Sequence, residues 1–367
     1  MKNTFGNNIS LTIFGESHGN AIGAVIDGLA PGIPVNEDKI ASLLSLRRPA
    51  GKISTSRHEE DKFVIESGVF EGYTTGTPVC ILIPNENTQS KDYSATRALA
   101  RPSHADYTAY EKYHGFEDYR GGGHFSGRIT AALVAAGGIL IPALEAKGVF
   151  IGTHIKSIAG ICDRDFADVT EDIKAVSEKN FPVFSSEIEA EMQKKILEAA
   201  QEGDSVGGVL ETAVIGLPRG LGEPWFDTLE GMISHAVFSV PAVKGIEFGA
   251  GFAVAGMRGS QANDTMRMEN GTVTAQSNSN GGIVGGISNG APLLFRCAVK
   301  PTPSIFKEQE TVDFIKGENA TLSLIGRHDP CIVHRAAVVV RSVVALALAD
   351  QLATRYGTDW LSGGAKK

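Results

Sequence analysis

Residues 23–32 read GAVIDGLAPG, and residues 212–220 read TAVIGLPRG. Each stretch is a short apolar run rich in valine and isoleucine that ends in a turn containing glycine and proline, which is typical of a β-strand followed by a tight turn. A helical pattern follows each stretch and ends before a proline, at Pro49 and at Pro241. The similarity predicts an internal two-fold repeat of a strand–turn–helix unit, although turns of this kind also recur by chance.

Outside this unit, runs of β-branched residues with turn borders predict further strands, giving the set 10–14, 21–27, 63–70, 79–83, 150–158, 207–215 and 293–300. Helical patterns begin at Asn36, at the capping box of Ser186 and Glu189, and at Asp227. Two further helices, 129–147 and 336–356, are apolar on all sides, so we expect them in the core or against another subunit. Because no linker interrupts the pattern, we predict an α+β fold in which residues 1–367 form a single domain.

The composition is that of an ordinary globular protein. The net charge is −8, so no basic excess favours nucleic-acid binding. No apolar run reaches the roughly 18 uninterrupted residues of a membrane span, and the N-terminus lacks an apolar signal segment, so we expect neither a membrane protein nor a secreted one. Widely spaced cysteines predict reduced, mostly buried thiols in the cytoplasm: Cys80, Cys162, Cys297 and Cys331.

Glycine accounts for 43 of the 367 residues, well above the usual share. Many of these glycines lie in polar loops that also hold His18, His104, His124 and His328, where the backbone can approach a ligand closely. Basic residues gather in the same loops, which predicts a positive cavity for a small polyanion, unless they pair with neighbouring acids such as Glu60, Asp106 or Asp118. These basic residues are Arg47, Arg48, Lys52, Arg57, Arg101, Arg120, Arg128, Lys300, Arg327 and Arg335.

Two other kinds of site receive little support. A metal site would combine His18, His104 and His328 with Asp106 or Asp329, but no H-x-H or H-E-x-x-H spacing is present, and arginine beside the candidate ligands disfavours a cation. The glycine-rich loops match neither a Walker loop nor a dinucleotide-binding loop.

Six segments together resemble the signature segments of the chorismate synthase family, in that family's order. They are 15–19 (GESHG), 101–106 (RPSHAD), 118–123 (DYRGGG), 281–290 (GGIVGGISNG), 300–304 (KPTPS) and 327–331 (RHDPC). The resemblance implies a β-α-β sandwich, assembled as a homotetramer. It also implies a lyase of the shikimate pathway that converts 5-enolpyruvylshikimate 3-phosphate to chorismate and phosphate by 1,4-anti elimination. The family requires reduced FMN without net redox change, with NADPH as a candidate reductant.

The resemblance also implies roles for individual residues. His18 would be the acid near the leaving phosphate, His104 would balance the charge of the reduced flavin, and Asp329 would relay a proton. The expected flavin contacts are His124, Phe125, Ser126, Ala242, Gly285, Lys300, Pro301, Thr302, Pro303, Ser304 and Arg327. The expected substrate contacts are Ser17, Arg47, Arg48, Arg128 and Arg335, of which Arg47 is also a candidate for NADPH.

The sequence departs from the family pattern at three places. His124-Phe125 replaces the common Arg-Ser after the three glycines, Ser103 replaces a glycine, and Lys52-Ile53 stands where a second arginine is common. These changes affect single phosphate and nucleotide contacts.

The alternatives to this function are a non-catalytic flavin- or anion-binding protein on the same scaffold, and a metal-dependent phosphatase. The joint presence of His18, His104 and Asp329 argues against simple binding.

Overall fold

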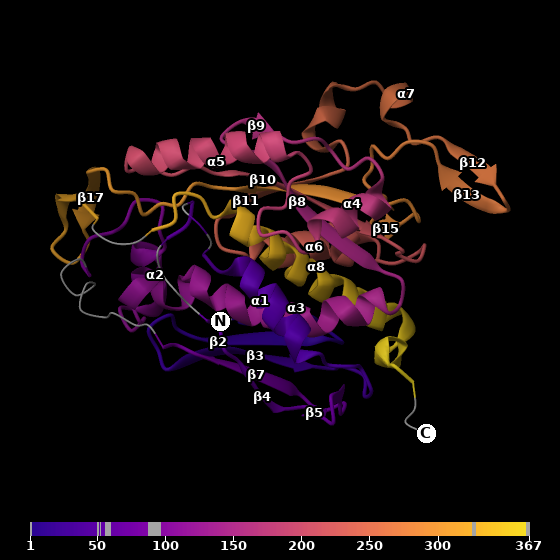
Figure 1. Ribbon diagram of the computed structural model, residues 1–367, viewed down its shortest axis with the longest axis horizontal. Coiled ribbons are helices and arrows are strands. Elements are labelled where there is room, and N and C mark those ends of the chain that lie inside the picture. The colour runs from indigo at the N-terminus through magenta and orange to yellow at the C-terminus, as the bar shows by residue number, and fades with distance from the viewer. Residues whose placement is uncertain are drawn as a thin grey trace.

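Two antiparallel sheets enclose a layer of helices (Figure 1). The computed structural model describes residues 2–49, 51, 53–55, 60–86, 97–324 and 328–364. The first sheet has the order β1 (Thr4–Phe5), β2 (Ser10–Gly15), β3 (Ala21–Asp27), β7 (Val79–Pro84) and β4 (Val64–Ser67). The second has the order β11 (Val243–Phe248), β16 (Leu293–Val299), β10 (Gly208–Ile215), β8 (Phe150–Ile158) and β9 (Ile161–Cys162). This arrangement confirms the α+β class and the β-α-β sandwich.

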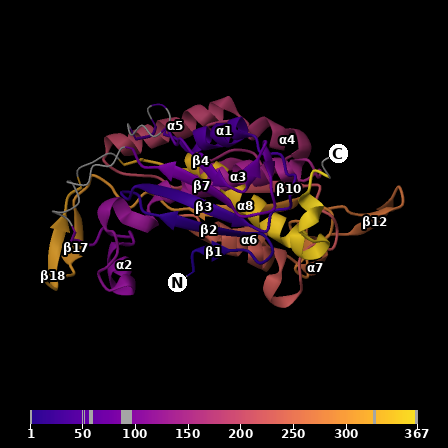
Figure 2. The ribbon, with the colours of Figure 1, turned by 90° about the horizontal axis from the view of Figure 1, so that it is seen from below.

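The remaining elements fill and border the sandwich. The middle layer is formed by contacts among α1 (Glu37–Arg47), α3 (Thr130–Glu145), α6 (Leu229–Phe238) and α8 (Val333–Tyr356). The helices α4 (Val169–Val176) and α5 (Ser186–Gln201) pack against β8 and its neighbours, and the short helices are α2 (Asp106–Tyr113) and α7 (Gly259–Ala262). Four hairpins are β5 (Val69–Phe70) with β6 (Tyr73–Thr74), β12 (Met266–Glu269) with β13 (Thr272–Ala275), β14 (Ile283–Val284) with β15 (Ile287–Ser288), and β17 (Gln309–Asp313) with β18 (Glu318–Leu322). Figure 2 shows the hairpin of β17 and β18 and that of β12 at opposite ends of the molecule.

The two halves of the sandwich share one topology, which confirms the predicted repeat. The first half runs β2, β3, α1, β4, β7, α3, and the second runs β8, β10, α6, β11, β16, α8, once inserted segments are set aside. In both sheets the four strands lie in the order first, second, fourth, third. The quoted stretches 23–32 and 212–220 therefore occupy equivalent positions, at the ends of β3 and β10.

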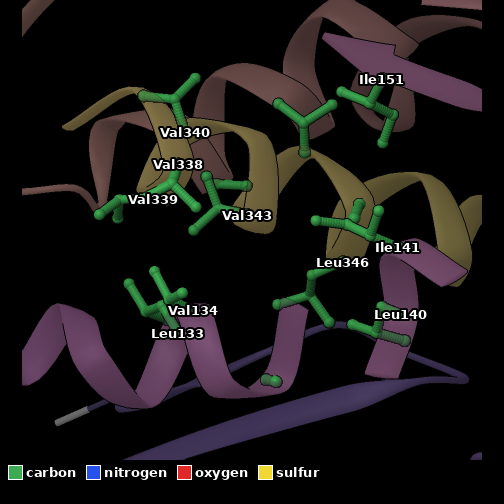
Figure 3. Packing of buried hydrophobic residues seen from close by; sticks show 14 of the residues in the cluster. Leu133, Val134, Leu140, Ile141, Ile151, Val338, Val339, Val340, Val343 and Leu346 are labelled. Atoms are coloured by element: carbon green, nitrogen blue, oxygen red, sulfur yellow. The ribbon is translucent and has the colours of Figure 1, made fainter. Parts of the chain in front are cut away.

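The two apolar helices, α3 and α8, are buried inside the chain. Figure 3 shows Leu133 and Val134 of α3 opposite Val339 and Val343 of α8. By length and composition both helices could cross a membrane, contrary to our expectation, but 89% and 100% of their apolar windows are buried inside the fold. The helices thus need no subunit contact to cover them, which removes that alternative.

Several local expectations differ from the structure by one residue or more. The residues that cap α5 and α6 are Ser185 and Thr228, rather than the predicted Ser186 and Asp227. Ser185 Oγ accepts a hydrogen bond from Ile188 N, and Thr228 Oγ1 accepts one from Gly231 N. Cys162 is exposed and Cys80 is half-buried, so the expectation of mostly buried thiols is wrong for these two. Burial raises the pKa of the Cys297 thiol, and that of Cys331, to about 12.

Gly138 allows α3 to approach α1 closely. A Cβ at this position would lie 2.7 Å from Ile40 Cγ1 and 2.8 Å from Ile40 Cα, and the latter is a backbone atom that cannot rotate away. We expect Gly138→Ala to lower the free energy of unfolding by about 1–3 kcal/mol through overpacking, although alanine normally favours a helix. Urea unfolding measures this change.

Gly259→Ala in α7 is the matched control, because a Cβ there meets no atom within 4 Å. That variant should be as stable as the parent chain or slightly more stable. An equally stable Gly138→Ala protein would show that α1 and α3 can separate at no cost.

Candidate active site

A glycine loop brings the two predicted catalytic histidines together. The backbone has φ values of 59° at Gly121 and 85° at Gly122, a region that favours glycine. A Cβ on Gly121 would lie 2.2 Å from His18 Cε1, and one on Gly122 would lie 3.1 Å from His104 Cε1. Consecutive glycines therefore contact the two imidazole rings, and a side chain at either position would push against a ring.

The loop that carries His18 is fixed to the glycine loop by hydrogen bonds. Ser17 N donates to Gly123 O at 3.1 Å, and Ser17 Oγ donates to Arg120 O at 3.1 Å. Ser17 Oγ also lies 3.1 Å from Nδ1 of the buried His18. His124 Nδ1 lies 2.7 Å from Gly15 O. Ser17 and His124, predicted as substrate and flavin contacts, thus hold the two loops together.

His104 is oriented by a carboxylate and an arginine. His104 Nδ1 lies 2.8 Å from Asp106 Oδ1, and Asp106 accepts hydrogen bonds from Nε and Nη2 of Arg101, both at 2.7 Å. Burial alone would raise the pKa of Asp106, but the hydrogen bonds from Arg101 and His104 outweigh it and hold the pKa well below its usual range. Asp106 therefore stays ionised and directs Nδ1 toward itself, which leaves Nε2 on the opposite edge of the ring, the edge that borders Gly122.

Some arginines pair with neighbouring acids, which was the alternative to a positive cavity. Arg101 pairs with Asp106, and Arg120 pairs with Asp118 at 2.7 Å. The hydrogen bond from Arg120 is the largest cause of the lowered pKa of Asp118.

Arg47 and Arg128 converge on a carboxylate that sequence reasoning missed, Asp61. Arg47 Nη1 donates to Asp61 Oδ2 at 2.6 Å, Arg128 Nη1 donates to Asp61 Oδ1, and Arg48 Nε lies 3.8 Å from Asp61 Oδ2. The Asp61 side chain is 0% exposed. Burial would raise its pKa, but the charges of Arg47 and Arg128 outweigh this and lower the pKa.

Asn85, also missed, connects this arginine cluster to the His18 loop. Its Oδ1 accepts a hydrogen bond from Arg128 Nε at 3.0 Å, and its Nδ2 donates to Glu16 O and Gly19 O, both at 2.9 Å. The only sequence signal for Asn85 was its place just after the predicted strand 79–83.

Asp329 and Arg335 join the other side of the cluster. Asp329 Oδ1 accepts a hydrogen bond from Thr55 N at 2.9 Å, and its Oδ2 pairs with Arg335 Nη1. Arg335 Nε in turn donates to Arg47 O at 2.6 Å. The predicted proton relay, Asp329, therefore belongs to one network with the four arginines predicted to contact substrate. We call these four the arginine cluster: Arg47, Arg48, Arg128 and Arg335.

The expected flavin segment, Lys300 to Ser304, follows β16 and lies beside the His104 loop. Lys300 Nζ donates to Ser103 O at 2.6 Å, and Lys300 N donates to Ala242 O at 2.9 Å. Ser205 Oγ donates to Thr302 O at 2.7 Å, while Thr302 Oγ1 is buried without a hydrogen bond to the described residues. Within this segment Ser304 is buried, Pro303 is half-buried and Pro301 is exposed.

The other expected flavin positions have different settings. Phe125 packs edge-on against Tyr113, and Ser126 Oγ accepts from Arg128 N at 3.3 Å. Gly285 lies in the turn between β14 and β15. Leu229 N, at the start of α6, donates to Gly286 O and so fixes this turn to the helix. Figure 1 shows β15 on the side of the molecule opposite α2. Arg327, Lys52 and Arg57 lie outside the described residues.

The metal alternative gains no donor cluster from the fold. His104 and Asp106 are in contact. Within the part of the chain that the structure describes, however, no group of three or more His, Cys, Asp or Glu side chains could hold a metal ion.

His334, at the start of α8, predicts a specific sensitivity to acid. Its Nε2 lies 3.0 Å from Ser54 Oγ, and burial, with a smaller contribution from the charge of Arg335, lowers its pKa to about 3. The unfolded chain binds a proton here near pH 6.5, so the neutral ring stabilises the fold above that pH, and this stability is lost as the pH falls toward 3. From pH 6.5 to 4.5 we expect a loss of about 2–3 kcal/mol, at about 1.4 kcal/mol per pH unit.

Chemical unfolding of the parent chain and of His334→Gln across this range isolates the effect. The parent should lose stability relative to the variant as the pH falls, whereas His114→Asn, at an exposed histidine, should follow the parent. Parallel curves for the parent and His334→Gln would contradict the assignment.

Known proteins with this fold and with similar sequences were found by comparison, and the solved structure comes first. A crystal structure of a chorismate synthase matches with a TM-score of 0.73 and 27% identity, covering 96% of this chain and 94% of that one. Residues 9–353 match the family model for chorismate synthase. A chorismate synthase of Dehalococcoides mccartyi is 45% identical over 97% of this chain and 98% of its own length. One from Korarchaeum cryptofilum is 43% identical over 95% and 96%. The chain belongs to the chorismate synthase family.

Proposed function

We propose that this chain is a lyase of the shikimate pathway, which leads to the aromatic amino acids. It converts 5-enolpyruvylshikimate 3-phosphate to chorismate and phosphate by 1,4-anti elimination. Family membership over nearly the whole chain supports this activity. The observation that carries it is the contact of His18 and His104 with consecutive glycines of one loop, together with the hydrogen bonds of Asn85 that join the His18 loop to the arginine cluster.

The charges of the network suit this substrate. The substrate carries a phosphate and two carboxylates, and guanidinium groups bind such oxygens with paired hydrogen bonds. Arg48 is the most exposed arginine of the cluster, with 31% of its side chain accessible, and Arg335 follows with 16%. We assign direct substrate contact to these two and a supporting position to the nearly buried Arg47 and Arg128.

The histidines have distinct roles in the elimination. His18, steadied by Ser17, donates a proton to the departing phosphate. His104, whose Nδ1 lies 2.8 Å from Asp106 Oδ1, is placed to balance the charge of the reduced flavin. Asp329 accepts and passes on the proton that leaves carbon, from a position held by Thr55 N and Arg335.

The residues present fit a phosphate-bearing cofactor, and we propose reduced FMN. The buried Thr302 hydroxyl needs a hydrogen-bond partner, and Lys300 supplies a positive charge beside the His104 loop. Lys300 to Ser304, Ala242 and Ser126 would hold the flavin near His104. When bound, reduced FMN supplies electron density as phosphate departs, with no net redox change. We propose NADPH as a candidate reductant.

We further propose a cytoplasmic homotetramer with no nucleic-acid or membrane partner. Trp225, Phe226 and Phe252 are each at least 85% exposed, and exposed aromatic side chains of this kind favour contact with another subunit. The hydrophobic cluster that contains residues of both sheets supports a single domain over residues 1–367. Sedimentation velocity at micromolar concentration should show the tetramer, and a stable monomer would contradict it.

An anaerobic assay tests the activity. With chemically reduced FMN the chain should form chorismate and phosphate in equal amounts, and EDTA should not change the rate. Phosphate released without chorismate, in a metal-dependent way, would indicate a phosphatase instead. Flavin binding without either product would indicate a non-catalytic protein. NADPH as sole reductant then shows whether the chain reduces its own flavin.

A further inference from the structure

Asp61 joins three segments that are far apart in the sequence. Arg47 ends α1, Arg128 precedes α3, and Asp61 precedes β4, yet the two guanidiniums each donate to a different oxygen of the one carboxylate. Asp61 has φ 50°, a left-handed conformation that aspartate tolerates better than most residues. The carboxylate is thus held from both sides.

The charge of this carboxylate is needed where it lies. Arg47 and Arg128 are 3% and 8% exposed, and a guanidinium does not lose its proton in a protein. The buried guanidinium groups of Arg47 and Arg128 both contact the Asp61 carboxylate, and without its negative charge between them they would repel each other strongly. Removing that charge should therefore separate the two arginines.

The consequence of such a separation reaches the reacting groups by two routes. In the first route, Arg128 donates a hydrogen bond to Asn85, and Asn85 donates to the backbone carbonyls of Glu16 and Gly19 in the His18 loop. Arg47 O holds Arg335, which pairs with Asp329. Neither route requires Asp61 to touch a ligand.

We infer that Asp61 is a positioning residue, the shared counter-ion that fixes Arg47 and Arg128 and through them the His18 loop and the pair of Arg335 with Asp329. This inference rests on the proposed function. A different role would be competition, in which the carboxylate occupies the place of a substrate anion and must be displaced. The two roles predict opposite changes in substrate affinity.

The test compares Asp61→Asn, Asp61→Glu and the control Asp163→Asn in the full chain. Asp163 is also a buried aspartate, but its carboxylate accepts hydrogen bonds from Arg164 N and Phe184 N, away from the arginine cluster. We expect Asp61→Asn to raise KM for 5-enolpyruvylshikimate 3-phosphate about 10- to 100-fold, the range for loss of a charged hydrogen bond. Asp61→Glu, which keeps the charge, should recover part of this loss. Asp163→Asn should change stability without changing KM.

A binding measurement separates failure of this inference from failure of the proposed function. Inorganic phosphate should raise the melting temperature of the parent and of Asp163→Asn, and this rise should be smaller in Asp61→Asn, whether or not chorismate forms. Tighter binding by Asp61→Asn would show competition and overturn the inference. So would a lower melting temperature with unchanged KM and phosphate response. If Asp61→Asn does not fold, Asp61→Glu decides, because its longer side chain displaces the carboxylate between the two arginines. A raised KM with a smaller phosphate response then supports positioning, and tighter phosphate binding than in the parent overturns it.

Discussion

His104→Ala is expected to lower kcat by about 10²–10⁴-fold, the usual contribution of a positioned acid–base group, while KM changes little. The substrate anions are assigned to the arginine cluster, so removing the imidazole does not remove their anchor. What the variant loses is an imidazole ring held in place by Asp106, whose own pKa is kept low by Arg101 and by His104 itself. Steady-state kinetics with reduced FMN measures both constants.

His114→Asn is a matched control for this prediction. His114 is the C-cap residue of α2, the helix that begins two residues after His104. It is exposed, and asparagine tolerates its left-handed backbone. Its kcat should equal that of the parent. Asp106→Asn should lower kcat less than His104→Ala, because the ring remains but loses its charged partner. An unchanged kcat in His104→Ala would return this histidine to a structural role.

The regular parts of the fold were predictable because their sequence patterns are local. The predicted ranges 21–27 and 150–158 coincide with β3 and β8, and Asn36 caps α1 as expected. The strand β11 was missed because a single short run with charged Lys244 and Glu247 carries no clear alternation. The repeat was visible only at its turns, and its full extent required the order of strands in the two sheets.

The site was only partly predictable, for a physical reason. The histidine and arginine loops carry motifs, whereas Asp61 and Asn85 are single polar residues in no motif. Asp61 meets Arg47 across 14 residues and Arg128 across 67, so only the fold reveals the pairing. Gly285 is the opposite case: its motif implies a flavin contact, and the structure places it in the turn between β14 and β15, next to the start of α6.

Asp329→Asn should lower kcat by about 10²–10⁴-fold if the carboxylate relays the proton, because asparagine keeps the shape but removes the base. The structure makes this test sharper than the sequence did. Asparagine can still accept the hydrogen bond from Thr55 N, so the loop should stay in place, but the charge pair with Arg335 is lost.

Arg335→Met separates these two effects, since it breaks the same pair and leaves the carboxylate intact. A relay requires that Asp329→Asn lose far more kcat than Arg335→Met, with similar melting temperatures and flavin affinities. If Asp329 merely holds Arg335, both variants should raise KM alike and keep kcat at saturation. Because Arg335 also holds Arg47 O, that second result would transfer the importance of Asp329 from proton transfer to substrate binding.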